Sequence, residues 1–592
     1  MTAAEPSDPA ARWCVLGYAA ADRRAENAAA AILALDLGRD GTPGTATELS
    51  PARLADFVRG REAAGGTRWV WSDTAHWLPA LLAAGVRVER CHDLRLCHAV
   101  LRSSAFVGDR SALVAANEWG RASIDVAPAP RDTALFDLDT AETVTDRSVP
   151  HGHAEALAEF TRQLSALDGS EPEAAARLGL LLAAESAGAL IATELRAAGL
   201  PWDAHEHDRI LREALGPRPQ LGAKPQKMVA LAEQISGALE EPRLSIDSAP
   251  KLLASLRRAG IDVQSTSRWE LAEHEHPAIE PLLHYKKLAR LLSANGWAWI
   301  DEWVRDGRYR PVYVPGGVVT GRWASSGGGA LQLPRLLRPA IRADEGWMLV
   351  SADVAQLEPR VLAAMSGDRA MAAAGLGHDL YSGLVESGVV ETRQEAKIAV
   401  LGAMYGSTTG DAGRLVPRLR RSFPYAMRTV DEAASVGERG GIVSTWLGRS
   451  SPAPSEEWFE LQARAQSSGA TAADEVRARR AARDFGRFTR NFIVQGTAAE
   501  WSLAWLADLR LRLARLPQTE APAPASGPAF STRAHLAFFL HDEVIVHTPV
   551  EQAEAVALAV SASAAAAGRV LFGETPVEFP LDVRVAPRAA KE

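Results

Sequence analysis

Hydrophobic positions along the first 135 residues alternate between short strand-like runs and one apolar helical run. The strand-like runs are "RWCVLGY", "AAILALDL" and "TRWVWSD", and the helical run is "HWLPALLAAGV". Short runs rich in β-branched, aromatic and apolar residues are typical of strands. Strands mixed with a helix over this length predict a small α/β domain.

Helical spacing of the apolar positions dominates from residue 178 to about residue 296, and Gly199 is the expected end of the first long helix. The polar, mixed segment 136–174 before it is expected to be a linker. Helices are expected again through the 370s to the 510s. The Pro/Ala/Ser/Gly segment 519–531 predicts an exposed loop that leads into the strand "RAHLAFFL".

Composition narrows the class of protein. The chain has 592 residues, 47% of them hydrophobic and 23% charged, which is typical of a soluble globular protein too long for one core. No run approaches the roughly 18 consecutive apolar residues that cross a membrane. The acidic, polar N-terminus is unlike a signal peptide. We therefore expect a cytoplasmic protein with no membrane partner.

The cysteines and the net charge bear on two further kinds of site, a zinc site and a basic surface for nucleic acid. Three cysteines with no CxxC pair argue against zinc and for a reduced setting. The net charge of −8 argues against a uniformly basic coat for nucleic acid but leaves room for a local basic cleft. Only 7 of the 65 basic residues are lysines, so a lysine at a motif position is informative.

Two strand-like segments carry acids at positions that suit metal binding. The segment "FFLHDEVIVHTP" places Asp542 and Glu543 between apolar runs, and the strand "WMLVSADVA" ends near Asp353, just before an expected helix. Two strand-borne aspartates can bind a pair of Mg²⁺ ions about 3.5–4 Å apart, which stabilises the attacking and leaving oxygens of a phosphoryl transfer. The alternative is that each acid is a hairpin or cap aspartate.

A third segment, "TRQEAKIAVLGAMYG", predicts a helix in which Arg393, Lys397, Leu401 and Tyr405 recur at every fourth position. They form a slowly spiralling stripe about 18 Å long. Arginine and lysine at one end suit a triphosphate, and tyrosine at the other suits a base or a sugar. The alternative is a solvated charged face beside a core tyrosine, but the scarcity of lysine favours a function for Lys397.

These three segments, in this order and at this spacing, resemble motifs A, B and C of the family A DNA polymerases, the DNA polymerase I type. Motif A of that family is DYSQIELR, and this chain has "DVAQLEPR" from Asp353. Motif B is RxxxKxxxFGxxYG, and this chain has "RQEAKIAVLGAMYG" from Arg393. Motif C is HDE, as at His541 to Glu543. "TGRWASS", "IVSTWLGR" and "RNFIVQGTAAE" resemble further family segments, and the resemblance covers roughly residues 175–592.

The resemblance implies an α+β multidomain protein with the palm, fingers and thumb of a polymerase, preceded by a small α/β RNase H-like domain. Residues 1–150 would form a degenerate 3′–5′ exonuclease-like domain with its linker, and residues 151–592 the polymerase domain. Within the latter, the thumb would span about 175–300, the palm about 301–370 and 490–592, and the fingers about 371–489. Such a protein would be a monomer that acts on primer-template DNA and dNTPs, at the nucleoid if the source is bacterial.

The resemblance also implies roles for the matched residues. Asp353 and Asp542 would hold two Mg²⁺ ions, with Glu543 or the Ala352 carbonyl assisting, and Lys397 would protonate the leaving pyrophosphate. The incoming nucleotide would be bound by Arg393, Lys397, Glu358, Leu401 and Tyr405, with Glu358 as the steric gate against a 2′-hydroxyl. The primer terminus and template would be bound by Arg322, Arg487, Asn491, Gln495 and His541, and the cluster Arg477 to Arg487 would neutralise DNA phosphates.

Two departures from the family pattern change the expectations. Leu401 replaces the usual aromatic residue of motif B, which predicts looser selection of the sugar. Residues 1–150 contain no D-x-E motif, and the first expected strand has no acid. Asp73 and Asp93 remain and are expected to be loop or cap residues. The N-terminal domain is therefore expected to pack against the polymerase without hydrolysing DNA.

Two other functions remain open on the sequence. A polymerase-shaped DNA-binding scaffold without useful turnover would account for the substitutions in motifs A and B, although both aspartates and the charged helix are present. A two-metal nuclease would account for the acids alone, but the triphosphate-binding helix would then have no role.

Overall fold

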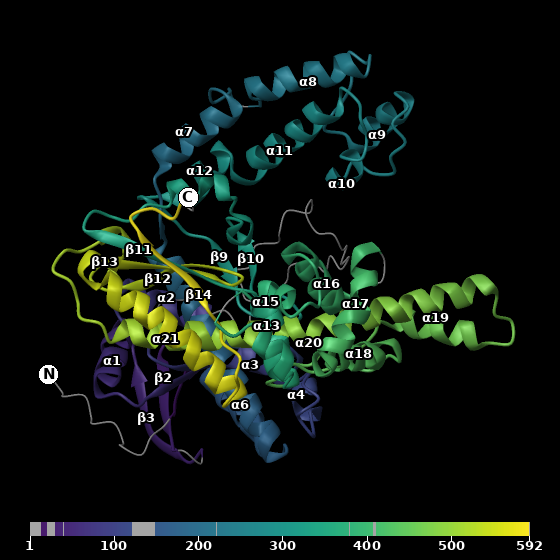
Figure 1. The fold of residues 1–592 in the computed structure, drawn as a ribbon. Coiled ribbons are helices and arrows are strands. Elements are labelled where there is room, and N and C mark those ends of the chain that lie inside the picture. Colours follow the sequence, from purple (N-terminus) through teal and green to yellow (C-terminus); the bar gives the residue numbers. More distant parts are fainter. Residues whose placement is uncertain are drawn as a thin grey trace. The chain divides into compact units, whose positions relative to one another are not determined.

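The computed structural model describes residues 13–19, 30–38, 41–120, 149–220, 222–377, 379–406 and 410–590. The chain divides into two compact units, each with helices and strands (Figure 1). The first unit comprises residues 1–199, 312–327 and 344–586, and the second comprises residues 200–311, 328–343 and 587–592.

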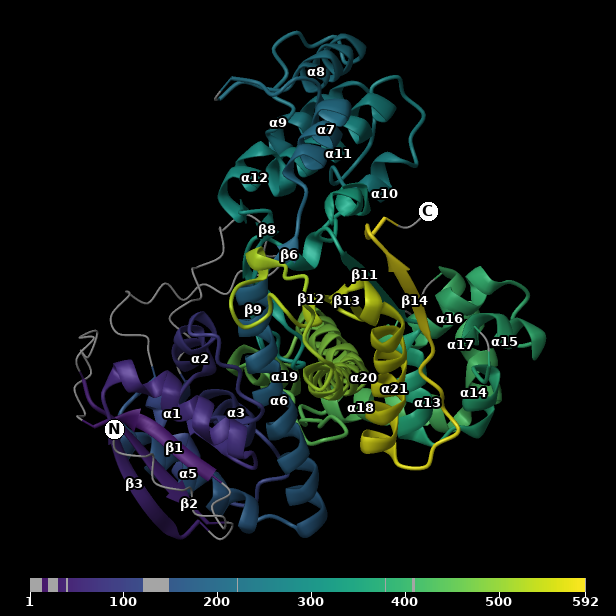
Figure 2. The same ribbon diagram turned by 90° about the vertical axis from the view of Figure 1, so that its left-hand side faces the viewer.

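The first unit begins with a five-stranded sheet in the order β3-β2-β1-β4-β5; Figure 2 labels its strands β1, β2 and β3. β1, β2 and β3 form an antiparallel meander, and β4 and β5 run parallel to β1. These strands span Trp13–Tyr18, Ile32–Leu37, Pro43–Leu49, Arg68–Trp71 and Cys91–Asp93. This is the arrangement expected of an RNase H-like domain.

Both faces of this sheet are covered, which explains why β1 carries no charged residue. Successive side chains of a strand point to opposite faces. Cys14 and Leu16 are buried in one apolar core, and Trp13 and Val15 are buried in the other. The helices of this N-terminal domain are α1 (Pro51–Ala64), α2 (Thr74–Ala83), α3 (Leu94–Leu101) and α4 (Ser111–Ala115).

The prediction that segment 136–174 is a linker was wrong over much of its length. Residues His153–Asp168 form helix α5, in which Ala156 and Phe160 are buried. The ring of Phe160 lies edge-on to that of Trp13, with 5.1 Å between centroids. Half of the residues of α5 are polar, which is why the composition of the segment predicts a linker. Residues 136–148 lie outside the described part of the chain.

A second sheet of the first unit carries the predicted acids, and we call it the palm sheet. It is antiparallel, in the order β12-β13-β11-β14. Its strands span His535–Leu540, Glu543–Pro549, Trp347–Val354 and Leu581–Ala586. Helices that contact the sheet are α6 (Pro172–Ala198), α20 (Ala472–Ala514) and α21 (Ala553–Phe572).

Segment 519–531, predicted as an exposed loop, is partly buried. It contains a 3-10 turn over Pro524–Ser526, and the side chain of Phe530 is only 2% exposed. Phe530 packs into one core of the N-terminal domain. The composition of the segment predicts a solvated loop because one aromatic residue contributes little to it. Phe530 nevertheless anchors the segment.

Buried ion pairs attach the N-terminal domain and α6 to the rest of the first unit. Arg510 of α20 donates to both carboxylate oxygens of Glu194 of α6, at 2.7 and 2.9 Å, and to the carbonyl of Glu89 at 2.8 Å. Arg449 pairs with the buried carboxylate of Glu185, also on α6. Because a buried charge is stable only when it is paired, these contacts hold the N-terminal domain against the palm helices.

Glu500 joins two of the segments that resemble the polymerase family. Its carboxylate accepts hydrogen bonds from the Thr445 hydroxyl and from the amide of Leu447, the latter at 3.0 Å. Burial raises the pKa of Glu500 to about 7, although these hydrogen bonds and the charge of Arg449 lower it; the charge of Glu185 raises it slightly further.

We expect Glu500 to make the protein less stable as the pH rises from about 4.5 to about 7. In that window the folded protein keeps a proton on Glu500 that the unfolded chain has lost, so higher pH favours unfolding. The side chain of Glu500→Gln cannot ionise, so the variant should not show this fall in the free energy of unfolding. We expect the fall in wild type to be about 1–3 kcal/mol, at about 1.36 kcal/mol per unit of pKa shift. Thermal unfolding of both proteins at pH 5, 6 and 7 measures this difference. An identical pH dependence in the two proteins would contradict it.

The helices that follow β11 and precede α20 in sequence include those of the predicted fingers, and we call them the fingers region; α16 among them carries the predicted stripe. They are α13 (Leu357–Ser366), α14 (Arg369–Ala374), α15 (Leu380–Glu386), α16 (Arg393–Tyr405), α17 (Gly410–Ser422), α18 (Pro424–Glu438) and α19 (Glu456–Gln466). Leu419, Phe423, Met427 and Ile493 are among the residues of one shared core. This core holds α16 by its apolar side and leaves its charged side exposed.

Two helices, α6 and the segment Val550–Phe572, are long and apolar enough to cross a membrane by length and composition. In α6, 72% of the apolar window is buried inside the protein, as in the core helix of a soluble protein; in the second, 39% is buried. Length and composition alone do not assign a membrane span, and the absence of a membrane partner stays a prediction.

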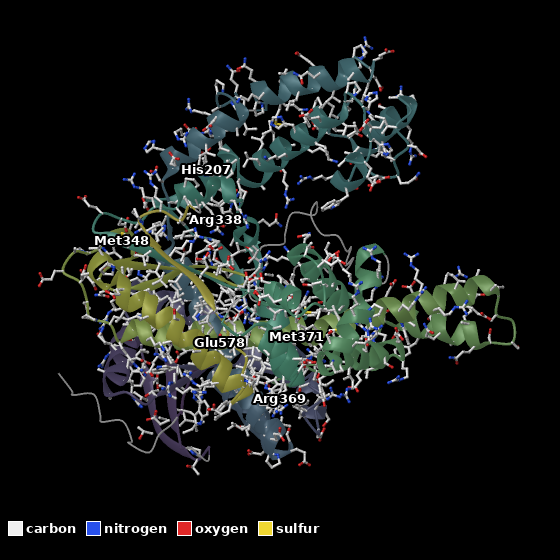
Figure 3. The ribbon with its side chains drawn as sticks, in the orientation of Figure 1. His207, Arg338, Met348, Arg369, Met371 and Glu578 are labelled. Atoms are coloured by element: carbon white, nitrogen blue, oxygen red, sulfur yellow. The ribbon has the colours of Figure 1, made fainter. Side chains whose placement is uncertain are left out.

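The second unit is mainly helical. It contains the small sheet β6-β8-β7. In α7, His207 is fully buried and its Nε2 lies 3.0 Å from the Asn295 carbonyl (Figure 3). Burial lowers the pKa of His207 to about 4, so the ring is neutral at pH 7. The elements are α7 (Ala204–Leu215), α8 (Gln226–Ala238), α9 (Ala249–Arg258), α10 (Arg268–Leu271), α11 (Ile279–Asn295), α12 (Trp297–Trp303), β6 (Leu200–Pro201), β7 (Val304–Arg305) and β8 (Arg308–Tyr309).

Candidate active site

Backbone pairing brings the predicted acids to one edge of the palm sheet. Asp353 of β11 pairs with Glu543 of β13, and Asp542 lies in the two-residue turn between β12 and β13. The amide of Val354 donates to the Asp542 carbonyl at 3.0 Å, which holds the turn against β11. His541, the first residue of the turn, has a left-handed φ of 56°, a conformation that histidine adopts more often than most residues.

The electrostatics of this edge fit a hard cation. Burial, and then the charge of Asp353, raise the pKa of Asp542 to about 6, as expected when two carboxylates share one site. The donors are all oxygen atoms, which Mg²⁺ prefers, and Mg²⁺ is often bound through one or two carboxylates plus substrate phosphates. Within the described residues, no group of three or more His, Cys, Asp or Glu side chains forms a metal cluster. The fit of this edge to Mg²⁺ therefore rests on Asp353 and Asp542.

Three segments far apart in the sequence meet at Glu358, in the first turn of α13. Its carboxylate pairs with Arg322 and accepts a hydrogen bond from the Tyr405 hydroxyl at 2.6 Å. Burial, and then the hydrogen bond to Glu358, raise the pKa of Tyr405, while a hydrogen bond with Gln495 lowers it. Burial, and then the charge of Arg322, lower the pKa of His541. The structure thus brings together five of the predicted site residues.

α16 is the helix that the sequence predicts, with a capping box between Thr392 and Glu395 at its start. Lys397 is exposed on its charged side. Leu401 is half-buried and packs against the core of the fingers. Tyr405, at its last position, is 38% exposed. The stripe therefore runs from exposed charges to the cluster at Glu358.

Arg393 has a partner that the sequence analysis missed. Its guanidinium donates to both carboxylate oxygens of Asp379, at 2.8 and 3.2 Å, and lies over the ring of Tyr381. Asp379 also accepts a hydrogen bond from the Gln356 side chain at 2.8 Å and caps α15. The sequence signal that could have identified Asp379 is its position three residues before Ser382, which is the spacing of a helix cap. A triphosphate would share Arg393 with this carboxylate or displace it.

The remaining predicted residues of α20 are Arg487 and Asn491. Arg487 pairs with Asp484, and its side chain packs against Gly406, where an added Cβ would come within 2.9 Å of it. Asn491 is half-buried, and its Oδ1 is buried without a hydrogen-bond partner among the described residues. Their roles in DNA binding stay predictions.

The expectation that Asp73 and Asp93 are cap residues is confirmed. Asp73 caps α2 and accepts a hydrogen bond from the Ala75 amide at 3.1 Å. Asp93 caps α3 and accepts from the amides of Leu96, at 3.0 Å, and Thr74, at 2.7 Å. Both carboxylates are thus engaged by backbone donors.

Comparison with known proteins gives one matching family. The model of DNA polymerase family A matches residues 251–588. The thermostable DNA polymerase I of Thermus aquaticus is 28% identical over 364 residues, which cover 56% of this chain and 38% of that protein. The DNA polymerase I of Chloroflexus aurantiacus is 30% identical over 346 residues, or 53% and 33% of the two chains. The chain thus matches less than two-fifths of the length of these relatives.

A solved structure shares the fold over almost the whole chain. It is described as the POL domain of Pol1 from M. smegmatis in complex with DNA primer-template and dNTP. The TM-score is 0.65, over 97% of this chain and 95% of that chain, at 17% sequence identity. At this identity the likeness concerns the fold alone, and it confirms the predicted α+β multidomain class with palm, fingers and thumb.

Proposed function

Because the chain belongs to DNA polymerase family A, we propose that it is a template-directed DNA polymerase, which adds dNTPs to a primer 3′ end by two-metal phosphoryl transfer in DNA replication or repair. The observation that carries the proposal is the meeting of Asp353 and Asp542 at one edge of the palm sheet. Beside that edge, Tyr405 links the charged face of α16 to Glu358. A nuclease or a scaffold has no use for this combination.

Asp353 and Asp542 would hold two Mg²⁺ ions, with Glu543 or the Ala352 carbonyl assisting. Bound there, the ions would stabilise the negative charge on the attacking and leaving oxygens. Without them, Asp353 and Asp542 repel each other, and this repulsion adds to the effect of burial in raising the pKa of Asp542.

The other residues position the nucleotide. Arg393 and Lys397 would bind the triphosphate, since guanidinium and ammonium groups form strong hydrogen bonds with phosphate oxygens, and Lys397 would donate a proton to the leaving pyrophosphate. Glu358, held by Arg322 and Tyr405, would fill the space that a 2′-hydroxyl needs. The partners would be primer-template DNA and dNTPs, and the protein would act as a cytoplasmic monomer.

Primer extension with the purified full chain tests this proposal. A primer labelled at its 5′ end, annealed to a longer template and given Mg²⁺ and four dNTPs, should be extended to the template end, and EDTA should abolish the reaction. A scaffold would bind the substrate and leave the primer unchanged. A nuclease would shorten it.

The N-terminal domain should not degrade DNA. With Mg²⁺ and no dNTP, single-stranded DNA should not shorten from its 3′ end above background, because Asp73 and Asp93 are committed to helix caps. Gel analysis of wild type beside Asp73→Ala and Asp93→Ala measures this. Shortening that either substitution removes, with the palm residues intact, would show that the domain is an active exonuclease.

A further inference from the structure

The loop of residues 444–450, between α18 and α19, is held by the N-terminal domain. The hydroxyl of Ser104, which follows α3, donates to the Gly448 carbonyl at 2.7 Å, and the backbone amide of the next residue donates to the Ser450 hydroxyl at 2.8 Å. Gly448 has a left-handed φ of 105°, and an added Cβ there would come within 2.7 Å of the ring of Phe106. The contact is therefore so close that only glycine fits at position 448.

Hydrogen bonds inside this loop fix the position of Arg449 relative to Gly448. The Thr445 amide donates to the Arg449 carbonyl at 2.8 Å, and the Arg449 amide donates to the Thr445 hydroxyl at 2.9 Å. The Gly448 amide donates to the Thr445 carbonyl at 3.2 Å. Thr445 is itself bonded to the buried carboxylate of Glu500 on α20. The loop is thus supported on one side by α20 and on the other by the N-terminal domain.

Arg449 extends this contact to the backbone that carries Arg322. The guanidinium of Arg449 pairs with the carboxylate of Glu185 on α6, which is fully buried. An added Cβ on Gly321 would come within 2.6 Å of the Nε atom of Arg449, and Gly321 has a left-handed φ of 84°. The next residue in sequence, Arg322, pairs with Glu358. Contacts therefore lead without a break from the N-terminal domain to the predicted sugar gate.

The support of Glu358 depends on the backbone beneath Arg322. The side chain of Arg322 is 33% exposed, so burial alone does not fix its position. A side chain that excludes part of a substrate must be held to within about 0.5 Å by the residues around it. Because the guanidinium of Arg449 lies directly against Gly321, a shift of Arg449 would move Arg322 and loosen Glu358.

We propose that the N-terminal domain is a positioning element for sugar selection: Ser104 and Phe106 hold the loop through which Arg449 fixes the support of Glu358. The inference rests on the proposed function, because Glu358 selects a sugar only in a polymerase. It gives the N-terminal domain a role that needs no hydrolysis. Ser104, Phe106 and Arg449 are positioning residues, since each acts through another residue.

Phe106→Ala in the full chain tests the proposal. It removes the ring that packs against Gly448 and leaves the ion pair of Arg510 with Glu194 intact. The ratio of kcat/KM for a matched dNTP to that for the matching rNTP should fall on the order of tenfold, through a higher kcat/KM for the rNTP, because the support of Glu358 is loosened. Phe106→Leu returns an apolar side chain to this position and should recover most of the ratio.

Phe57→Ala is the matched control. Phe57, on α1, is also a half-buried phenylalanine of the N-terminal domain, and its ring lies edge-on to that of Trp69 at 6.1 Å between centroids. The same substitution there should lower the unfolding temperature and leave the dNTP/rNTP ratio unchanged. Thermal unfolding of each variant compares the losses of stability and shows that both proteins are folded.

Hydrogen exchange, measured by mass spectrometry on the protein without substrates, follows the same link independently of turnover. Within residues 318–322 the amides of Val318 and Gly321 are hydrogen-bonded to carbonyls of the same segment, at 3.1 and 2.8 Å. In Phe106→Ala they should exchange faster, together with the amides of residues 444–450, because both segments open more often. In Phe57→Ala both segments should exchange as in wild type.

Three results would overturn the proposal. They are an unchanged dNTP/rNTP ratio in Phe106→Ala, an equal fall of the ratio in Phe57→Ala, and faster exchange in residues 444–450 that does not extend to residues 318–322. A wild type that never extends a primer would refute the proposed function. The exchange pattern would then decide by itself whether the N-terminal domain positions the backbone at Arg322.

Discussion

Asp353→Asn or Asp542→Asn should reduce nucleotide addition at least about 1,000-fold, because removing even a single preorganised group that stabilises transition-state charge costs about 10²–10³. Asparagine keeps the shape of the side chain and removes the negative charge that would hold the metal. Both residues meet at one edge of the palm sheet. Affinity for primer-template DNA should remain close to that of wild type, because neither aspartate supplies attraction for phosphates.

Single-turnover extension and a separate DNA-binding measurement distinguish these two effects. Asp508→Asn, on the same chain unit in a surface pair with Arg512, is the control and should retain wild-type rates. Each site variant should unfold at the same temperature as wild type or higher, since burial of the charge and the repulsion between the two carboxylates, which together raise the pKa of Asp542, are relieved. Extension within about tenfold of wild type in either variant would refute the metal-binding assignment.

Glu358→Ala should raise the use of ribonucleotides relative to deoxynucleotides by about 100-fold, within the range that a change of fit in a binding pocket produces. Glu358 is held from two sides, by Arg322 and by the Tyr405 hydroxyl at 2.6 Å. It is therefore a fixed wall beside the expected position of the sugar. The values of kcat/KM for a matched dNTP and rNTP, measured on each variant, give the discrimination directly.

Two milder variants calibrate the effect on sugar selection. Tyr405→Phe keeps the ring and loses the hydrogen bonds of the hydroxyl to Glu358 and Gln495, so selection should loosen by less. Leu401→Phe restores an aromatic ring and should tighten selection by about tenfold at most, because Leu401 already packs against the fingers core and a larger side chain has little room. An unchanged dNTP/rNTP preference in Glu358→Ala would show that Glu358 is not the gate.

Local patterns predicted the elements that carry the site. Strand β11 and the hairpin β12-β13 follow from their apolar runs, and α16 follows from its helical spacing. Asp73 and Asp93 are caps, as expected where an acid directly precedes a helix. These features depend on neighbouring residues, and the sequence contains all of that information.

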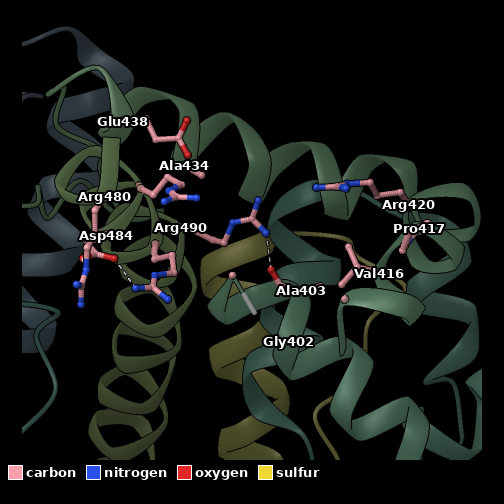
Figure 4. A pocket seen from close by; sticks show the side chains of 15 residues that line it. Gly402, Ala403, Val416, Pro417, Arg420, Ala434, Glu438, Arg480, Asp484 and Arg490 are labelled. Atoms are coloured by element: carbon pink, nitrogen blue, oxygen red, sulfur yellow. Dashed lines mark hydrogen bonds and ion pairs between the residues drawn. The ribbon is translucent and has the colours of Figure 1, made fainter. Parts of the chain in front are cut away.

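Features that depend on distant residues could not be predicted. α5 is stable because β1 covers Phe160, and segment 519–531 is partly buried because Phe530 enters the core of the N-terminal domain. The partner of Arg393 is 14 residues away, across a change of direction between α15 and α16. The arginine cluster of α20 was visible in the sequence, but its sharing of one cavity with Arg420 of α17 depends on the packing of the helices (Figure 4).

Template-directed incorporation of single nucleotides tests the central claim most directly. Four primer-templates that differ only in the base after the primer end are each given one dNTP at a time, with Mg²⁺ and the full chain, and the kcat/KM of every pair is measured. The account predicts that on each template the complementary dNTP is incorporated with the highest kcat/KM, and that changing the template base changes the preferred nucleotide accordingly. No incorporation on any template, or a preference that stays the same when the template base changes, would contradict it.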